Sequence, residues 1–519
     1  MGRLDETLVV RLVAAALLIG LVIRLWPMAM GMPALGQAFV TEDGYLMLTV
    51  ARNLAMGLGL SVSEGTIPTN GVQPLATLLY AVPYVLTDGD KVTTLYPLHV
   101  LWAAIAVAGA VALRAFAGRV LGPLGLAPVW AWMAVALWFC GPLPAQHTMN
   151  ALETGLYTLL ILLACLQFMR VVGRGAQVGT GDLVLMAGLL GLVFLGRNDG
   201  IFLVVSLSVV WLVHALVTLG MRPAELARKL ALPAVVCAAV VAPWLIHNQL
   251  LFGSIVPISG TAQSLAVEFG RNAALVPAVL FENMFTMLPI PNRFETMPPV
   301  MIVVGLAVLA VLGRFVWRAW KVGGAVRLVV LGYLLHGIAI STYYGLFFGA
   351  PWFMPRYTAA VSPLLVIALV AVGWEVVQLV ARQRAVPIMG VLGIASLVLS
   401  LGLLSRALPS GQGHFHVVRW VEENVSTDTW VGAVQTGTLG YWHDRTINLD
   451  GKVNPEALQA RRDLGHVLFY VRDSEIDYLA DWIGITGWVE REGFGAYFEV
   501  IVDNPRGNLG VLRRREAGG

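Results

Sequence analysis

Charged side chains are scarce in this chain of 519 residues. They make up 13% of the sequence, whereas an ordinary soluble domain carries about 25%. Hydrophobic residues reach 58%, and the mean hydropathy is +0.76. The composition therefore excludes a soluble globular protein and indicates a polytopic membrane protein. The formal net charge of +3 is small and spread along the chain, which argues against a nucleic-acid partner.

Cysteine is almost absent. The three cysteines, Cys140, Cys165 and Cys237, all fall within hydrophobic segments, so none of them can link the outer loops. The sequence therefore predicts no structural disulfide. The first hydrophobic segment also lacks the small-residue cleavage pattern of a signal peptide, and we expect it to remain as a membrane helix.

Long hydrophobic runs, in contrast, are abundant, and eleven of them are long enough to cross a bilayer, which takes about 20 helical residues. Lys and Arg gather in every second connection between these runs, a pattern that marks cytoplasmic loops. The sequence therefore predicts an inner (cytoplasmic) membrane protein with a cytoplasmic amino terminus and with everything after residue 404 outside. The apolar stretch 72–87 is short, and we expect it to lie in the outer interface. The expected spans are 8–30, 96–117, 125–143, 152–170, 181–196, 200–219, 229–246, 299–317, 326–348, 357–379 and 386–404.

From residue 411 onward, charges, aromatic residues and turns replace the apolar runs. Helical spacing at 413–424 and mixed patterns over roughly a hundred residues predict a small α/β domain on the outer surface. The predicted domains are a transmembrane domain at 1–404, with outer loops at 31–95 and 247–298, and an extracytoplasmic α/β domain at 405–519. The strands expected in the second domain are 429–433, 446–449, 467–471 and 497–502.

An acidic pair, Glu42 and Asp43, follows the first span and opens an expected helix at 44–53. Charged groups beside hydrocarbon are costly unless they are paired or hydrated, so acids at this position are candidates for chemistry. The alternative is helix capping, because negative charge at the amino end of a helix is favourable by about 0.3 to 1 kcal/mol. The two roles are compatible.

Several motifs occur in an order that resembles the GT-C superfamily of integral-membrane glycosyltransferases. The acidic pair is followed by Ala-Arg-Asn-Leu at 51–54 and by Pro-Thr-Asn-Gly at 68–71. Each motif alone is weak, but their shared order over nearly the whole chain is fairly specific. The further motifs are Asn-Ala-Leu-Glu-Thr at 150–154, Gly-Arg-Asn-Asp-Gly at 196–200, the segment 247–254, Pro-Arg-Tyr at 355–357 and the segments 440–442 and 450–455.

The resemblance implies a sugar transfer on the outer face of the membrane. A polyprenyl-phosphate-linked monosaccharide would be the donor, and a glycan, lipid or protein of the cell envelope would be the acceptor. An inverting displacement needs one base for the acceptor hydroxyl and a stabilising charge for the departing phosphate. The resemblance implies Asp43 as this base, with Glu42 orienting it or helping to hold a metal. It implies no certain cofactor and leaves a divalent cation open.

Arg356 is the leading candidate for binding the donor phosphate, because guanidinium grips phosphate oxygens in a bidentate fork. It stands with Tyr357 where the tenth span meets the outer surface, and Arg24 near the outer end of the first span is a second candidate. Snorkelling to the interface is the alternative for both arginines. Residues expected to line the site are Arg52, Asn70, Glu153, Arg197, Asp199, His247 and Asn248.

Bland interpretations apply to several polar residues. Arg197 and Asp199 would neutralise each other at a hairpin tip. The polar residues of the outer loop 247–298 would be ordinary solvent-exposed loop residues without a role in the site. His414 and His416 lack a recognisable third ligand for a metal. Residues 450–454, which include Lys452, fit acceptor contact or turn chemistry, and we assign them no catalytic role.

Two other function classes fit part of this pattern. A transporter or flippase of lipid-linked sugars would also expose acids and arginines at an interface, but such folds usually show internal repeats and sites at the bilayer midplane. Here the polar motifs gather at one face, which favours an enzyme. A noncatalytic partner in envelope-glycan assembly is the third class, and the full acidic and arginine set argues against it.

Overall fold

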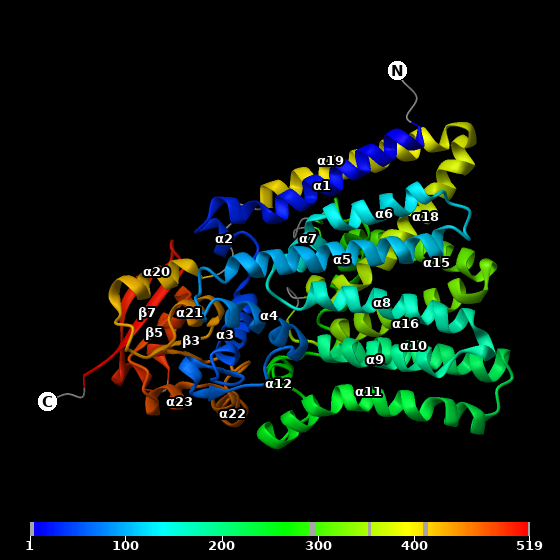
Figure 1. The fold of residues 1–519 in the computed structure, drawn as a ribbon. Helices are drawn as coiled ribbons and strands as arrows, with labels where there is room; N and C mark the ends of the chain where they lie inside the picture. Colours follow the sequence, from blue (N-terminus) through cyan, green and yellow to red (C-terminus); the bar gives the residue numbers. More distant parts are fainter. Residues whose placement is uncertain are drawn as a thin grey trace.

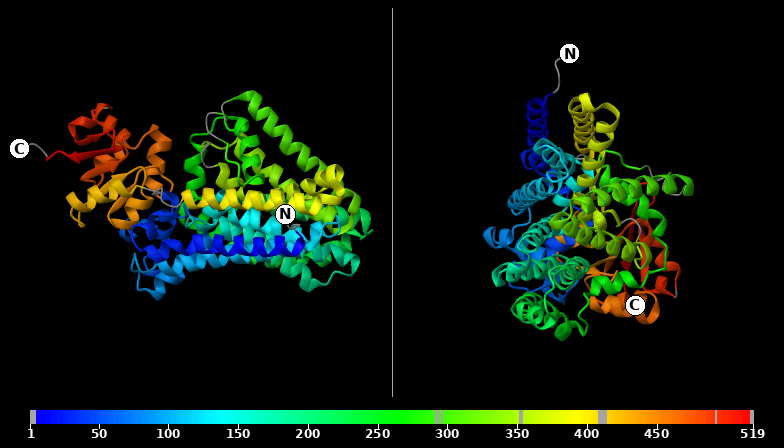
Figure 2. Two further views of the ribbon diagram at one scale, coloured as in Figure 1. Left: turned by 90° about the horizontal axis from the view of Figure 1, so that it is seen from above. Right: turned by 90° about the vertical axis from the view of Figure 1, so that its right-hand side faces the viewer.

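The computed structural model describes residues 5–290, 294, 297–350, 354–407, 414–491 and 493–516. Long helices lie side by side in a bundle, and a smaller unit of helices and strands covers one end of it (Figure 1). We call this smaller unit, residues 414–516, the α/β unit. The view from above shows the same division (Figure 2, left).

Each of the eleven expected spans coincides with a helix or with a pair of consecutive helices. The high content of aliphatic residues in these segments explains this, because backbone polar groups in lipid must be satisfied within the segment. The helices are α1 (Glu6–Met30), α5 (Leu95–Leu121), α6 (Pro128–Cys140), α7 (Pro142–Met149), α8 (Thr154–Gly173), α9 (Thr180–Gly196), α10 (Ile201–Val213), α11 (Pro223–Phe252), α15 (Pro298–Val322), α16 (Gly324–Leu346), α18 (Ser362–Ala381) and α19 (Ala385–Ala407).

Within the described ranges, eight segments are long and apolar enough to cross a membrane, and α6 with α7 makes a ninth if this pair, bent by 63°, is one span. The bend lies at Gly141, which is extended because the following Pro142 disfavours a helical conformation there. The eighth segment, Met354–Arg406, contains both α18 and α19, and α9, with 17 residues, is slightly shorter than any of these eight segments. The chain is an integral multi-pass membrane protein.

The two ends of the bundle differ in charge. Arg119 lies in the last turn of α5, Arg170 in the last turn of α8 and Lys321 in the last turn of α15, all at the end away from the α/β unit (Figure 1). The short turn at Arg382–Arg384 between α18 and α19 adds two more cations there. This is the clustering that the alternating basic loops predict, and the assignment of that end to the cytoplasm stays a prediction.

The first outer loop folds into short helices at the opposite end. They are α2 (Ala34–Gln37), α3 (Glu42–Ala55) and α4 (Pro74–Leu86). Helix α3 confirms the helix expected at 44–53. Helix α4 has 13 residues, too few to cross a bilayer, and it packs against α3.

The long loop expected at 247–298 begins later than predicted. Helix α11 continues to Phe252 and ends at Gly253, whose left-handed conformation (φ 69°) caps it. The loop prediction was therefore wrong for His247 and Asn248, which are helical, because polar residues can extend a membrane helix beyond the hydrocarbon. The loop itself contains α12 (Ile258–Ser264) and α13 (Val276–Met284).

The α/β unit holds one five-stranded sheet in the order β4-β3-β5-β7-β6. Strand β3 pairs in parallel with β4 and β5, and β7 pairs antiparallel with β5 and β6. The strands are β3 (Val431–Ala433), β4 (Thr446–Asn448), β5 (Tyr478–Asp481), β6 (Phe498–Asn504) and β7 (Leu509–Arg514), and the helices are α20 (Phe415–Asn424), α21 (Gly437–Trp442), α22 (Pro455–Leu464) and α23 (Leu468–Asp473).

Three of the four expected strands are confirmed, as β3, β4 and β6. The strand expected at 467–471 is wrong, because this run forms α23. Its buried residues Val467, Leu468 and Val471 recur with helical spacing, and a short apolar run cannot be assigned by composition alone. Strands β5 and β7 were not predicted.

The α/β unit packs firmly on the first outer loop. Val453 is fully buried against Val50, Val62 and Val72. The hydroxyls of Tyr84 and Tyr441 form a 2.9 Å hydrogen bond across the same junction. The two parts of the chain thus meet directly behind α3, the helix that carries the acidic pair.

Candidate active site

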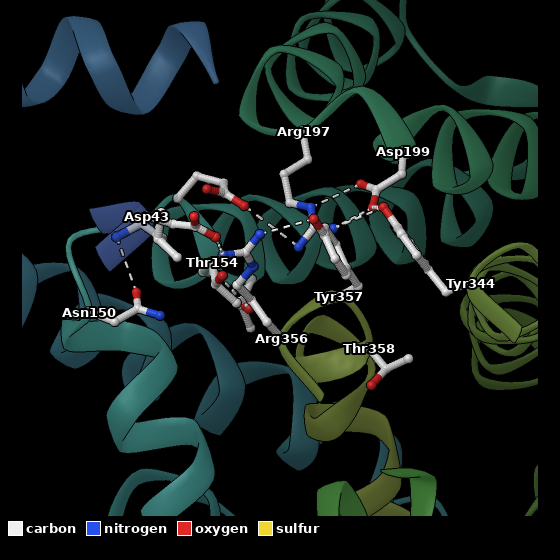
Figure 3. A network of polar contacts seen from close by, with 12 residues as sticks. Asp43, Asn150, Thr154, Arg197, Asp199, Tyr344, Arg356, Tyr357 and Thr358 are labelled. Carbon is white, nitrogen blue, oxygen red and sulfur yellow. Dashed lines mark hydrogen bonds and ion pairs between the residues drawn. The ribbon is translucent and has the colours of Figure 1, made fainter. Parts of the chain in front are cut away.

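Asp43 lies at the start of α3, and its carboxylate does not cap the helix. The helix is capped instead by Thr41, whose Oγ1 accepts a hydrogen bond of 3.2 Å from the Gly44 amide. Asp43 Oδ2 accepts a 2.7 Å hydrogen bond from Nη1 of Arg356 (Figure 3). Its other oxygen lies 4.0 Å from Nζ of Lys452. One carboxylate therefore stands between two cations.

These cations set the charge state of Asp43. Desolvation raises the pKa of the Asp43 carboxyl, but the positive charges of Lys452 and Arg356 lower it by more, so the pKa lies below its ordinary value. Arg356 belongs to the short helix α17 (Met354–Thr358) and also donates to the hydroxyl of Tyr357 at 2.9 Å. Asp43 is thus ionised at neutral pH.

A second charged cluster surrounds Arg197. Its guanidinium donates to both oxygens of Asp199, at 3.1 and 2.5 Å, and lies 3.6 Å from Glu153 (Figure 3). Tyr344 donates to Asp199 at 2.7 Å. The Arg197 side chain is only 2% exposed, so this buried guanidinium has two carboxylates as partners, and the Tyr344 hydroxyl satisfies one of them further.

Arg197 and Asp199 of this cluster lie in the break between α9 and α10. Arg197 ends α9 with an extended backbone, and Asn198–Gly200 form one short turn before α10 begins. Irregular backbone near a membrane end is tolerated where it lines a cavity. This turn does so.

The two clusters face one cavity of about 400 Å³ at the end of the bundle next to the α/β unit. Its charged lining consists of three acids and three bases, namely Asp43, Glu153, Asp199, Arg197, Arg356 and Lys452. Much of the remaining wall is aromatic and aliphatic, and it includes Phe202, Val256, Tyr343, Phe347 and Phe348. A ligand with a charged group, a polar body and an apolar tail would fit such a wall.

The structure brings six of the predicted site residues to this cavity: Asp43, Arg356, Tyr357, Glu153, Arg197 and Asp199. Glu42 points elsewhere. Its carboxylate accepts hydrogen bonds from the amides of Gly437 and Thr438 and from the Thr438 hydroxyl, which ties α3 to α21 of the α/β unit. Desolvation raises the pKa of Glu42 to about 7, although these donors favour its ionised form.

Arg24 is not brought to the cavity. Its guanidinium is fully buried within the bundle and donates to the backbone carbonyls of Gly20 (3.0 Å) and Phe139 (2.7 Å). We expected the donor phosphate as its partner, or snorkelling to the interface. Backbone carbonyls take that place here, and the face of the Phe139 ring adds a cation–π contact at 3.9 Å.

Four further expected lining residues lie outside the cavity wall. Arg52 donates to the Gly89 carbonyl and to Asp444, so it holds the α/β unit. Asn70 and Asn248 are buried behind the wall and bond to each other at 3.1 Å. His247 stacks on Trp244 with ring centroids 5.6 Å apart.

No catalytic role was predicted for Tyr344 and Lys452, which both line the cavity. Tyr344 is an ordinary aromatic of the ninth span, and its contact with Asp199 depends on how α16 packs. Lys452 follows an Asp-Gly turn, which is common loop chemistry. The charged residues of this loop, Asp450 among them, were visible in the sequence as possible acceptor contacts. Only the fold shows that the loop reaches Asp43.

The charged residues do not form a recognisable metal site. Among the described parts of the chain, no group of three His, Cys, Asp or Glu side chains could hold a metal ion. The Glu42 carboxylate, which could have joined Asp43 in such a group, faces the α/β unit.

Solved structures share this fold. ArnT from Cupriavidus metallidurans bound to undecaprenyl phosphate aligns over 98% of both chains with a TM-score of 0.60 and 14% identity. The oligosaccharyltransferase AglB from Archaeoglobus fulgidus, in complex with an inhibitory peptide and a dolichol-phosphate, aligns over 98% of this chain and 74% of its own with a TM-score of 0.60 and 12% identity. Both are GT-C membrane glycosyltransferases, so the chain has the GT-C fold that its motifs predict.

Sequence comparisons are less informative. Residues 406–506 match a domain of unknown function, DUF8728, which covers most of the α/β unit. No curated protein matches the sequence.

Proposed function

We propose that this protein is an inverting glycosyltransferase that moves a single sugar from a polyprenyl-phosphate donor to a cell-envelope glycan, lipid or protein. The observation that carries the proposal is the contact of Asp43 with Arg356 at 2.7 Å in the wall of a cavity at the end of the bundle. A base and a phosphate-binding cation are the two groups that this reaction needs. The lipid phosphates bound to ArnT and AglB support this donor class.

The reaction assigns one role to each group. The acceptor hydroxyl oxygen attacks the anomeric carbon while the bond from that carbon to the phosphate oxygen breaks. Polyprenyl phosphate leaves with the electron pair, and Arg356 holds its oxygens. Asp43 takes the hydroxyl proton.

The proposed domains follow the same division of labour. The helical part, residues 1–404, carries Asp43 and Arg356, and residues 405–519 form an extracytoplasmic domain above the site. The amino terminus lies in the cytoplasm of the cell, so the cavity opens on the outer face of the inner membrane. The basic residues at the other end of the bundle support this orientation.

The test is a transfer assay with purified protein, a panel of radiolabelled polyprenyl-phosphate monosaccharides and a crude envelope acceptor. Asp43→Asn should lower turnover by about 10²- to 10⁴-fold, the usual contribution of a general base, while donor binding is retained. The matched control is Asp444→Asn, because Asp444 is a paired acid at the same junction but outside the cavity.

Two results would contradict the proposal. Full turnover in Asp43→Asn would remove Asp43 as the base. Movement of labelled donor across vesicle membranes without any transfer would identify a transporter of lipid-linked sugars instead.

A further inference from the structure

Lys452 differs from the other charged residues of the cavity in its origin. The five other charged lining residues come from the bundle and its first outer loop, whereas Lys452 comes from the loop between β4 and α22 of the α/β unit. We propose that the α/β unit completes the active site, with Lys452 as a positioning residue that holds the Asp43 carboxylate once the donor phosphate has engaged Arg356. This inference rests on the proposed sugar transfer.

The two oxygens of Asp43 face two different cations. Arg356 contacts Oδ2 at 2.7 Å, and Nζ of Lys452 lies 4.0 Å from Oδ1. When a phosphate shares the guanidinium of Arg356, Asp43 loses part of its first ion pair. A carboxylate that is only 21% exposed is costly without a cation, and Lys452 is already in place to supply one.

Asp450 keeps Lys452 within reach of Asp43. Its Oδ2 lies 3.1 Å from Nζ of Lys452, and its Oδ1 accepts a 2.8 Å hydrogen bond from the Lys452 amide. The lysine side chain is 19% exposed and the Asp450 side chain 11% exposed. A lysine held at both its amide and its ammonium group has little freedom to leave the cavity.

The backbone of Lys452 is also fixed against the bundle side. A Cβ at Gly71 would stand 1.9 Å from the Lys452 carbonyl oxygen, so the two backbones touch with no room for a side chain. The next residue, Val453, is fully buried in the junction. The α/β unit thus contacts two adjacent residues at the start of α3. Its helix α21 binds Glu42, and Lys452 lies beside Asp43.

The competing interpretation is a purely structural lysine at a domain junction. Lys91 provides the comparison, because it bridges the same two parts of the chain. Its Nζ lies 3.1 Å from Asp444 and donates to the Trp442 carbonyl at 3.2 Å. It does not line the cavity.

The test compares steady-state kinetics of the purified full-length protein, with the donor and acceptor that the wild type uses. In Lys452→Met, kcat should fall by about 10- to 100-fold, the loss expected for a misplaced catalytic group, with little change in the KM for donor. Lys452→Arg should recover most of this loss. Lys91→Met should keep kcat within about twofold, as for a junction residue away from the chemistry.

Several outcomes overturn the inference. Equal losses in Lys452→Met and Lys91→Met would leave a structural role, and a raised donor KM with unchanged kcat would make Lys452 a donor ligand. If Lys452→Met does not fold, Asp450→Asn decides, because it removes the carboxylate that keeps Lys452 within reach of Asp43 and should lower kcat with little change in the donor KM; an unchanged kcat there would contradict the positioning role. A wild type without transfer from any donor refutes the proposed function itself, and the inference with it.

Discussion

The junction between α3 and α21 leaves no space for a side chain at Gly437. A Cβ at this position would stand 1.8 Å from the Glu42 carbonyl oxygen and 2.6 Å from its carbonyl carbon, whereas real Cβ contacts essentially never fall below 3.0 Å. Both neighbours are backbone atoms and cannot rotate away. Gly437→Ala should therefore push α3 and α21 apart by about 1 Å.

The size of the effect follows from two contributions. Overpacking costs about 1 to 3 kcal/mol. The separation also weakens the bonds from Thr438 to the Glu42 carboxylate, at 2.9 Å from its amide and 2.5 Å from its hydroxyl, and hydrogen bonds to charged groups are worth about 1.5 to 3 kcal/mol. A combined loss of about 3 kcal/mol would raise the population with an open junction about 100-fold, since 1.4 kcal/mol corresponds to a factor of ten.

A buried cysteine at the junction measures that population. We would place it at Val453, which is 0% exposed, in a protein whose three natural cysteines are changed to alanine. The rate of labelling by a water-soluble maleimide follows the open population when opening and closing are fast. Gly437→Ala should therefore accelerate labelling about 100-fold.

The control is Gly440→Ala in the same helix. A Cβ there would meet only the Thr446 side chain, at 3.7 and 3.9 Å, which is ordinary contact. Its labelling rate should match that of the parent protein. Equal rates in the Gly437 and Gly440 variants would refute the packing argument.

Three further predictions concern separate features. Arg356→Lys should raise the donor KM by about 10-fold or more through loss of a charged hydrogen bond, whereas Arg24→Lys should change it less than about twofold; equal effects would return Arg356 to an interface anchor. Burial lowers the pKa of His414 to about 3, so the folded α/β unit keeps this imidazole neutral and loses stability as the pH falls below 6.5, the ordinary pKa. His414→Phe should flatten this decline, which thermal melting at about pH 7 and pH 5 would measure. A cysteine at the exposed Ser426 should react with an impermeant label on intact cells, and one at Ala224 should not; the reverse pattern would invert the proposed topology.

The membrane helices could be predicted because their signal is local. A long apolar run is sufficient for a span, and α1, α5 and α16 begin and end within a few residues of the expected positions. The ends of these helices cannot be predicted from hydrophobicity alone, because α11 continues through the polar His247 and Asn248. The run at 467–471 shows the corresponding failure in the α/β unit, where burial on one helical face decides between helix and strand.

The candidate site was predictable where charge stands at a membrane end. Asp43, Arg356 and the Arg197 cluster are costly in such positions unless they are paired around a cavity, and the sequence marks them for that reason. Arg52 and Asn70 carry the same polar signal, but Arg52 is satisfied by the Gly89 carbonyl and Asp444, and Asn70 by Asn248. For Lys452 the sequence indicated only acceptor contact or turn chemistry. Its position beside Asp43 could not be predicted, because it depends on the docking of a distant part of the chain.

The balance of charge in the cavity explains why Asp43 is paired before any donor arrives. Three acids and three bases line the wall, so the formal charges of these side chains cancel. In the proposed sugar transfer, a phosphodiester donor adds one negative charge and competes with Asp43 for Arg356. The attraction that lowers the pKa of Asp43 then weakens, and its basicity rises at the moment when the acceptor hydroxyl needs a base. Because Lys452 remains beside the carboxylate, the gain in basicity does not require Asp43 to leave its place.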